Sequence, residues 1–274
     1  MTAVENEKFL RFKSIDEFNL LNQLGKGGYS TVYLVENKKT KRKYALKIAP
    51  RYKDEKDRSM RTLTEIQILK KLKHPKIIGL KGYFTDDEAI YVVLEYISGK
   101  DASKIFRHKL PNKTQVKYIM RQLVESVIYC HKQGIIHRDI KLENILIDDK
   151  FNIKLIDFGL AAIKEDPNEI FSQKLGTSRL MAPEMLSPKE EDGGYNESVD
   201  IWAIGVVLFM LLTGTYPFDG SSKQNIFRRI STKTLHYSKF DLSRNEIKLL
   251  KSLLEKDPEN RIEIENILDS PFFH

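Results

Sequence analysis

The sequence predicts an α+β protein with a small β-rich part followed by a larger, mainly helical part. Up to about residue 95, short segments rich in β-branched and aromatic residues alternate with polar turns. After Ser98-Gly99, apolar residues recur mostly with the period of a helix. We therefore expect one unit over about 18–96, a second over about 97–274, and a short N-terminal extension over 1–17.

The β-rich part is expected to hold five strands and one helix. A polar run over 37–41 separates two strand segments and predicts a hairpin turn. The helix is predicted around 61–72 and would end at His74-Pro75, because the residue before a proline disfavours the helical region. Its expected apolar face is Leu63, Ile66, Leu69 and Leu72, and the expected strands cover 18–24, 31–36, 43–48, 78–84 and 90–95.

The larger part is expected to be built from helices over 115–131, 198–213, 222–231 and 246–254, interrupted by a β-rich stretch over 145–155. The most apolar run, 201–212, is shorter than the ~20 residues that span a bilayer, so we expect a buried helix and no membrane partner. Cys130, the one cysteine of the chain, lies in an apolar helical pattern and is expected to be buried. A chain with one cysteine forms no intrachain disulfide, and we expect an intracellular location, cytoplasmic or nuclear.

The net charge of +8 does not by itself predict a nucleic-acid partner. The densest basic cluster, 38–43, falls on the expected hairpin turn and lacks aromatic residues of the kind that stack on bases. A solvated turn is the simpler interpretation, and a localisation or docking patch is the alternative. The six histidines show no ligand spacing with the lone cysteine, so no zinc site is expected.

Two features of the β-rich part are open to more than one interpretation. The glycine-rich segment 25–32 could bring backbone N–H groups close to phosphate oxygens, but a glycine-rich hairpin turn without a ligand fits it equally well. Lys47 lies between apolar neighbours on an expected strand. Glu65, on the following helix, could pair with it, because a buried ammonium needs a partner. Two unrelated surface charges are the alternative.

Three motifs in the larger part are far more specific. Residues 137–144 read His-Arg-Asp-Ile-Lys-Leu-Glu-Asn, 157–159 read Asp-Phe-Gly, and 182–184 read Ala-Pro-Glu. In this order and at these spacings they resemble the eukaryotic protein kinases, of the serine/threonine type and most like the calcium/calmodulin-dependent group. The resemblance covers 18–274. It implies a two-lobed kinase fold, with a β-rich N-lobe that carries one main helix and a mainly helical C-lobe.

The resemblance implies transfer of the γ-phosphoryl group of ATP, with Mg²⁺, to serine or threonine hydroxyls of proteins. Asp139 would be the catalytic base, and Lys141 would offset charge on the transferred group. Lysine two positions after that aspartate is typical of serine/threonine kinases, and Thr177 would contact both residues. Lys47, fixed by Glu65, would hold the α- and β-phosphates. The expected catalytic residues are Asp139, Lys141, Asn144, Lys47, Glu65 and Thr177, and the expected magnesium ligands are Asn144 and Asp157.

The adenine would lie between the lobes among apolar residues, each of which, taken alone, is more often simple core. Leu94 would guard the back of the pocket, the backbone of Glu95 and Ile97 would hydrogen-bond to the base, and Asp101 could reach the ribose. The expected nucleotide-binding residues are Leu24, Gly25, Lys26, Gly27, Gly28, Tyr29, Ser30, Val32, Ala45, Lys47, Leu94, Glu95, Ile97, Asp101, Glu143, Leu146 and Asp157.

The resemblance also implies residues that support the site structurally. For Arg138, it leaves open how the enzyme is activated. Asp200 would brace the loop that carries Asp139, and Arg261 would pair with Glu184. Arg138 would need an acidic or phosphorylated partner in the segment 157–184. Either Ser172 is phosphorylated to supply one, or the segment is ordered without phosphorylation.

The resemblance also bears on substrate choice and on rival functions. Glu143 and Asp101 would favour protein substrates with basic residues upstream of the target hydroxyl. A pseudokinase or scaffold is the main alternative, but it would typically lack Lys47, Asp139, Asn144 or Asp157, and all four are present. Dual specificity toward tyrosine is a further alternative, for which the sequence shows no supporting feature.

Overall fold

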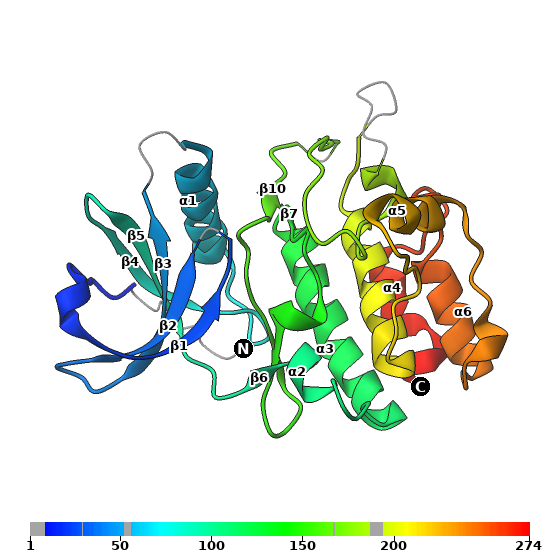
Figure 1. Cartoon of the computed structure of the whole chain (residues 1–274), viewed down its shortest axis with the longest axis horizontal. Helices are drawn as coiled ribbons and strands as arrows, with labels where there is room; N and C mark the ends of the chain where they lie inside the picture. Colours follow the sequence, from blue (N-terminus) through cyan, green and yellow to red (C-terminus); the bar gives the residue numbers. More distant parts are fainter. Residues whose placement is uncertain (1–8, 29, 52–55, 167, 187–193) are drawn as a thin grey trace, which may run out of the picture. The chain divides into compact units, whose positions relative to one another are not determined.

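The computed structural model describes residues 9–28, 30–51, 56–166, 168–186 and 194–274, and the chain divides into two compact units (Figure 1). Unit 1 comprises Met1–Lys73 and Ile78–Ser98, and unit 2 comprises His74–Ile77 and Gly99–His274. Unit 1 is built on a β-sheet and unit 2 is mainly helical, so the predicted α+β class is confirmed.

Unit 1 contains a five-stranded antiparallel sheet in the order β1-β2-β3-β5-β4 and one long helix, α1. The turn predicted over 37–41 is present, because Asn37 Oδ1 accepts hydrogen bonds from the backbone N–H groups of Lys39 and Thr40. The bounds are η1 (Ile15–Glu17), β1 (Phe18–Lys26), β2 (Thr31–Asn37), β3 (Lys43–Pro50), α1 (Lys56–Lys71), β4 (Leu80–Thr85) and β5 (Ala89–Glu95).

One face of this sheet packs into an aromatic core that includes residues upstream of β1. The core is built from Phe18, Val35, Tyr44, Leu46, Phe84, Ala89, Tyr91 and Val93. The ring of Phe12 lies 5.0 Å from that of Phe18 and 5.7 Å from that of Tyr44, and Leu10 N donates to Lys81 O at 2.7 Å. Leu10 and Phe12, upstream of β1, therefore contact the sheet of unit 1.

The buried face of α1 differs from the predicted one. Leu63 is 38% exposed, and Ile68 is fully buried instead. The buried stripe also includes two polar residues, Thr62 and Glu65. The prediction for Leu63 was wrong because an apolar pattern cannot detect a stripe that begins with polar side chains.

Unit 2 contains the four expected helices together with short strands and 3₁₀ turns, and α3, α4 and α6 lie side by side (Figure 1). The helices are α2 (Ala102–Ile105), α3 (Lys113–Lys132), α4 (Ser198–Thr213), α5 (Lys223–Thr232) and α6 (Arg244–Leu253). The strands are β6 (Lys100–Asp101), β7 (Ile135–Ile136), β8 (Ile145–Ile147), β9 (Ile153–Leu155) and β10 (Ala162–Ile163). The 3₁₀ turns are η2 (Leu142–Asn144), η3 (Pro183–Met185), η5 (Tyr237–Lys239), η6 (Ile264–Asp269) and η7 (Pro271–Phe273).

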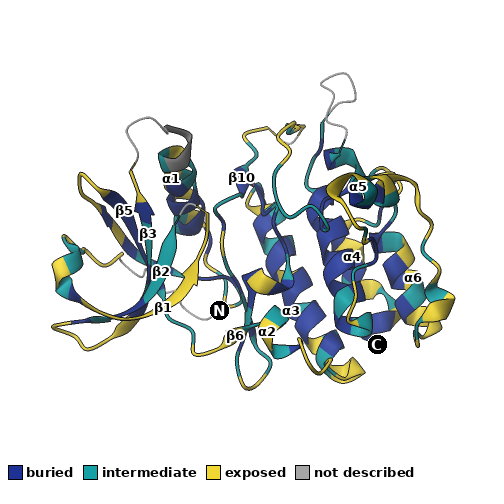
Figure 2. Ribbon diagram, viewed as in Figure 1, coloured by how far each residue is buried: buried dark blue, intermediate teal, exposed yellow. Residues whose placement is uncertain are grey.

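Helix α4 is buried along most of its length (Figure 2), as its apolar sequence predicts. A Cβ atom on Gly205 would lie 2.8 Å from Leu253 Cβ and 2.9 Å from a methyl of Leu254, so this glycine lets α4 and α6 approach closely. Cys130 on α3 is buried as predicted, and its burial raises the pKa of the thiol. None of the helices in the described ranges is long and apolar enough to cross a membrane.

Short strand pairings in unit 2 bring two of the three sequence motifs near each other. Strand β7 pairs with β10, and β8 pairs with both β6 and β9. The His-Arg-Asp motif follows β7, and the Asp-Phe-Gly motif lies between β9 and β10.

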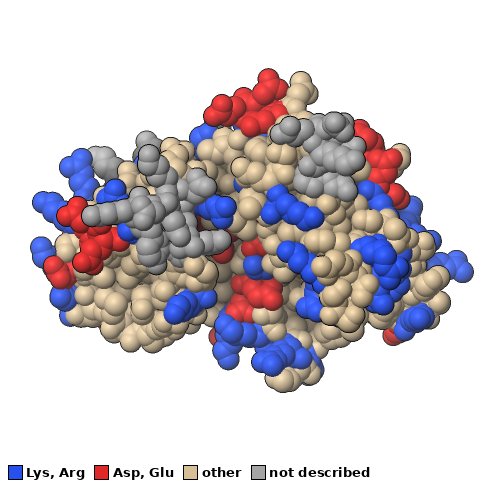
Figure 3. All heavy atoms as spheres, turned by 45° about the horizontal axis from the view of Figure 1, so that its top comes forward, with Lys and Arg blue, Asp and Glu red and all other residues tan. Residues whose placement is uncertain are grey.

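The face shown in Figure 3 carries basic side chains in several groups, with acidic and uncharged residues between them.

Candidate active site

The carboxylate of Asp139 is held by three side chains from two segments of unit 2. Lys141 Nζ lies 2.6 Å from Oδ2, and Asn144 Nδ2 donates to the same oxygen at 3.1 Å. Thr177 Oγ1 donates to Oδ1 at 3.2 Å and accepts from Lys141 Nζ at 3.4 Å. Asp139 is 8% exposed, so these donors compensate a charge that has little contact with water. The contacts expected of Thr177 are present.

The backbone of the loop before Asp139 is fixed by Asp200 of α4. Asp200 Oδ2 accepts from His137 N and Oδ1 accepts from Arg138 N, both at 2.8 Å, and His131 Nε2 lies 2.9 Å from Oδ2. Burial opposes ionisation of this carboxyl, but the hydrogen bonds and charges of the two histidines lower the pKa of Asp200 below its usual value. Arg138 has a φ of +62°, which is uncommon for a residue other than glycine, and Asp200 stabilises this conformation.

Asn144 and Asp157 lie at neighbouring ends of the β8–β9 hairpin. Ile145 pairs with Leu155, and Ile156 N donates to Asn144 O at 2.9 Å, which places Asp157 next in the chain. Asn144 Nδ2 donates to Asp139 O at 2.8 Å as well as to the carboxylate, so Asn144 Oδ1 is turned to another side. The donor set is one amide and one carboxylate oxygen, which are ligand types that magnesium prefers.

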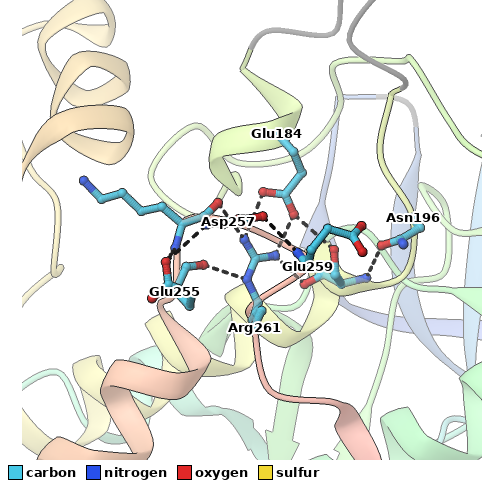
Figure 4. A network of polar contacts seen from close by, with 8 residues as sticks. Glu184, Asn196, Glu255, Asp257, Glu259 and Arg261 are labelled. Carbon is cyan, nitrogen blue, oxygen red and sulfur yellow. Dashed lines mark hydrogen bonds and ion pairs between the residues drawn. The ribbon is translucent and has the colours of Figure 1, made fainter.

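The Ala-Pro-Glu motif is anchored by a buried ion pair (Figure 4). Arg261 Nη1 lies 2.6 Å from Glu184 Oε1, and Arg261 Nη2 lies 3.0 Å from Oε2. The same guanidinium donates to the carbonyl oxygens of Glu255 and Ser198. The expected pair is therefore present, and its two-pronged geometry fixes the end of the segment that begins at Asp157.

In unit 1, Lys47 and Glu65 form a close ion pair. Lys47 Nζ lies 2.8 Å from Glu65 Oε1 and 2.7 Å from Oε2, and both side chains are largely buried. Strand β3 carries the lysine and α1 carries the glutamate. The alternative of two unrelated surface charges is therefore wrong.

The sheet face opposite the aromatic core carries Lys47 and three of the apolar residues expected around adenine. Leu34 pairs with Ala45, and Ala45 pairs with Leu94. Paired residues share a face and alternate residues return to it, so Val32, Ala45, Lys47 and Leu94 lie on one side of the sheet. Leu24, on β1, is 40% exposed.

The glycine-rich segment joins β1 to β2, and Gly27 N donates to Ser30 O at 2.9 Å. A Cβ atom at Gly25 or Gly28 would meet nothing within 4 Å, and none of the three glycines has a positive φ. Neither packing nor backbone conformation therefore requires glycine here, which favours the interpretation that a ligand approaches this backbone. Lys26 is exposed, Ser30 is half-buried, and Tyr29 lies outside the described residues.

The other expected nucleotide contacts lie in varied surroundings. In unit 1, the side chain of Glu95 accepts from Gly79 N at 2.8 Å, and Ile97 is half-buried. In unit 2, the carboxylate of Asp101 caps α2, accepting from Lys104 N at 3.0 Å and from Ser103 Oγ at 2.6 Å. Glu143 is exposed and Leu146 is half-buried. The roles assigned to these residues stay predictions.

The contacts that surround Arg138 were not predicted from the sequence. Its guanidinium donates to Leu160 O and to the hydroxyl of Tyr195, and it lies over the ring of Phe171. Tyr195 follows a strongly polar stretch, 187–194, and is 3% exposed. An aromatic residue at the end of such a stretch was the available signal that this residue packs against something.

Comparisons with known proteins show which family this sequence matches. The chain matches the family described as "Protein kinase domain" over residues 18–273. It is 34% identical over 268 residues to "Serine/threonine-protein kinase cds1" of Schizosaccharomyces pombe, which covers 94% of this chain and 58% of that protein. It is 34% identical over 263 residues to "SNF1-like protein kinase ssp2" of the same yeast, which covers 96% of this chain and 45% of that protein.

A plant protein is similar to the same extent. "CBL-interacting serine/threonine-protein kinase 8" of Arabidopsis thaliana is 33% identical over 265 residues, which covers 95% of this chain and 58% of that protein. The chain thus spans about half the length of the curated relatives it matches.

Proposed function

The chain belongs to the protein kinase domain family, and on this basis we propose that it transfers the γ-phosphoryl group of ATP to serine or threonine hydroxyls of proteins. The observation that carries the proposal is the cluster around Asp139, in which Lys141 and Thr177 contact the carboxylate and each other. Lysine at position 141 and threonine at position 177 are the residues that the resemblance links to serine and threonine substrates. An intracellular location and closest kinship with the calcium/calmodulin-dependent group are part of the same proposal.

In the proposed reaction, a bond forms between the acceptor hydroxyl oxygen and the γ-phosphorus while the bond from that phosphorus to the β–γ bridging oxygen breaks. Asp139 orients the hydroxyl and takes its proton, and ADP leaves. Lys141 stabilises negative charge on the transferred group from its position 2.6 Å from Asp139. Thr177 keeps these two side chains in register.

Magnesium is proposed to bind through Asn144 and Asp157, whose oxygen donors suit it. When bound, the ion neutralises charge on the phosphates. The residues of the chain position this chemistry. Asn144 also donates to Asp139, so one side chain connects the metal ligands to the catalytic base. Lys47, oriented by Glu65, is proposed to contact the α- and β-phosphates.

We propose that protein substrates carry basic residues upstream of the target hydroxyl. Glu143 supports this because its side chain is exposed two residues after Lys141, which contacts Asp139. Asp101 is less suited, since Lys104 already lies 2.8 Å from its carboxylate. A peptide-library screen with wild type and Glu143→Gln tests this. We expect the basic preference to weaken in the variant, and no basic preference in wild type would remove the proposal.

The activity is tested by transfer of radiolabelled phosphate from magnesium-ATP to a generic basic protein. Dephosphorylated wild type is compared with Asp139→Asn, whose fold is checked by circular dichroism. We expect the variant to be slower by about 10²- to 10⁴-fold, the usual contribution of a positioned acid or base. Phosphoamino-acid analysis should show phosphoserine and phosphothreonine, whereas phosphotyrosine would favour dual specificity. Bound ATP with no transfer, whatever the phosphorylation state, would favour a pseudokinase.

A further inference from the structure

Among the described residues, the groups that contact the guanidinium of Arg138 are uncharged. Arg138 Nε donates to Leu160 O at 2.7 Å, Nη1 donates to Tyr195 Oη at 3.3 Å, and the guanidinium carbon lies 5.3 Å from the centre of the Phe171 ring. Within the described ranges, no carboxylate lies at ion-pair distance from it. An arginine face over an aromatic ring is itself a favourable contact when water is excluded.

Tyr195 connects this arginine to the segment that begins at Asp157. Its hydroxyl accepts from Arg138 and donates to Gln173 O at 2.8 Å, so both hydrogen-bonding functions of the oxygen are used. The side chain is buried, and burial raises the pKa of Tyr195 above its ordinary value, so the hydroxyl stays protonated at neutral pH. Gln173 is four residues before Thr177, which contacts Asp139.

Backbone hydrogen bonds hold Tyr195 in this place. Phe171 N donates to Tyr195 O and Tyr195 N donates to Phe171 O, both at 2.8 Å. Gly194 makes the pairing possible, because its φ is +72° and a Cβ atom there would lie 2.7 Å from Phe171 O. The segment is thus attached to residues 194–195 by its backbone and to Arg138 by two aromatic side chains.

Ser172 is unfavourably placed to supply a phosphoryl group to Arg138. It is exposed, whereas its neighbour Phe171 lies over the guanidinium. In the extended bridge between residues 171 and 195, neighbouring side chains point to opposite sides. A phosphoryl group on Ser172 would therefore start on the side away from Arg138.

Resting on the proposed function, we propose that Tyr195 and Phe171 are positioning residues that hold Arg138 and the 171–177 segment in the catalytic arrangement without phosphorylation. In kinases whose activation segment is ordered by phosphorylation, new contacts between arginine and a phosphoryl group do this work. Here the hydroxyl of Tyr195 and the ring of Phe171 contact the guanidinium of Arg138 in place of a phosphoryl group. Holding Arg138 in place positions Asp139, the next residue in the chain. Holding the 171–177 segment in place positions Thr177, which contacts Asp139.

The test compares kcat and KM of phosphatase-treated enzymes, with mass spectrometry confirming that the 157–184 segment is unmodified. We expect wild type and Ser172→Ala to keep full kcat. Tyr195→Phe loses the hydrogen bond from the charged Arg138. Its kcat should therefore fall about tenfold or more, while its KM for ATP stays nearly unchanged. Phe171→Leu, which removes the aromatic face, should lower kcat by a smaller factor.

Two further variants separate positioning from a loss of stability. Tyr237→Phe removes a hydroxyl that makes no hydrogen bond with the described residues, and it should keep full kcat. Gln173→Glu added to Tyr195→Phe introduces a carboxylate in the residue whose backbone carbonyl contacts the Tyr195 hydroxyl, and it should restore part of kcat. The melting temperatures of all variants are measured alongside, and those of Tyr195→Phe and Tyr237→Phe should agree.

The proposal is overturned if phosphatase treatment abolishes wild-type activity, if Tyr195→Phe keeps wild-type kcat, or if Gln173→Glu restores nothing. Loss of kcat in Tyr195→Phe that merely follows a lower melting temperature overturns it as well. A wild type that is inactive in both its phosphorylated and dephosphorylated forms would instead contradict the proposed function.

Discussion

Asp200 Oδ1 accepts a hydrogen bond from the backbone N–H of Arg138 at 2.8 Å, so a residue of α4 fixes the conformation of the loop that carries Asp139. The other oxygen of the same carboxylate accepts from the backbone N–H of His137. Two adjacent amide groups thus depend on one buried side chain that is 62 and 63 residues away in the chain. The position of Asp139, the proposed catalytic base, is in this way coupled to the packing of α4.

Replacing Asp200 with asparagine should lower both stability and activity. The asparagine side chain has only one oxygen to accept a hydrogen bond. Its NH₂ group would face the backbone N–H of either His137 or Arg138, which would then lack an acceptor. An unsatisfied buried donor costs about 1–3 kcal/mol, which should appear in the free energy of unfolding measured with urea at pH 7. The kcat should fall in parallel because the loop backbone is released. A variant with wild-type stability and kcat would show that the two hydrogen bonds do not matter.

The pH dependence of stability should differ between wild type and the same variant. Although burial opposes it, the contacts with His131 and His137 lower the pKa of Asp200 below its ordinary value of 3.8. A lowered pKa in the folded state contributes stability that is complete above pH 3.8 and is lost as the pH falls through the folded-state pKa. Urea unfolding from pH 6 to pH 2.5 should therefore show a steeper decline for wild type than for Asp200→Asn. Asp241→Asn, at an exposed position, is the control and should decline like wild type. An equal decline for wild type and Asp200→Asn would contradict the prediction.

The ion pair between Glu184 and Arg261 should contribute far more to stability than the one between Arg179 and Asp219. Arg261 is fully buried, whereas the side chains of the second pair are 42% and 55% exposed. Arg261→Ala leaves a buried carboxylate without its partner and should lower the free energy of unfolding by about 3–5 kcal/mol. Arg179→Ala should cost less than about 1 kcal/mol. If urea unfolding showed similar losses for the two variants, the larger contribution of the buried pair would be contradicted.

Gly82 allows the segment upstream of β1 to pack on the sheet. A Cβ atom there would lie 2.5 Å from Leu10 O and 2.8 Å from the Phe12 ring. Gly82→Ala should therefore displace this segment and lower the free energy of unfolding by about 1–3 kcal/mol, the usual cost of overpacking. Calorimetry should show a lower melting temperature, while Gly25→Ala, whose Cβ meets open space, should melt like wild type.

The site residues that lie in short motifs of unit 2 were predicted through the family resemblance. Asp139, Lys141 and Asn144 lie within one loop, and a short hairpin places Asp157 beside Asn144. The helices of unit 2 were also predicted, because α4 is continuously apolar and α3 shows clear helical spacing. For these helices, local sequence determines local structure.

Contacts between distant segments were not predictable without a family resemblance. Tyr195 is 57 residues from Arg138, and neither its aromatic character nor its polar surroundings reveal its partner. The buried stripe of α1 was misjudged at Leu63 because the buried Glu65 is charged and becomes compatible with burial only through Lys47 on another element. Such positions are determined by tertiary partners, which a single sequence does not display.

Burial of Cys130 gives the protein an internal reporter of its own opening motions. The thiol lies on α3 within unit 2, and its raised pKa leaves almost no reactive thiolate in the folded state. Because the chain has one cysteine, any modification by a thiol reagent reports on this single position. At high reagent concentration, the labelling rate would equal the rate at which α3 is exposed, so the unfolding kinetics of unit 2 could be followed in native buffer without a denaturant.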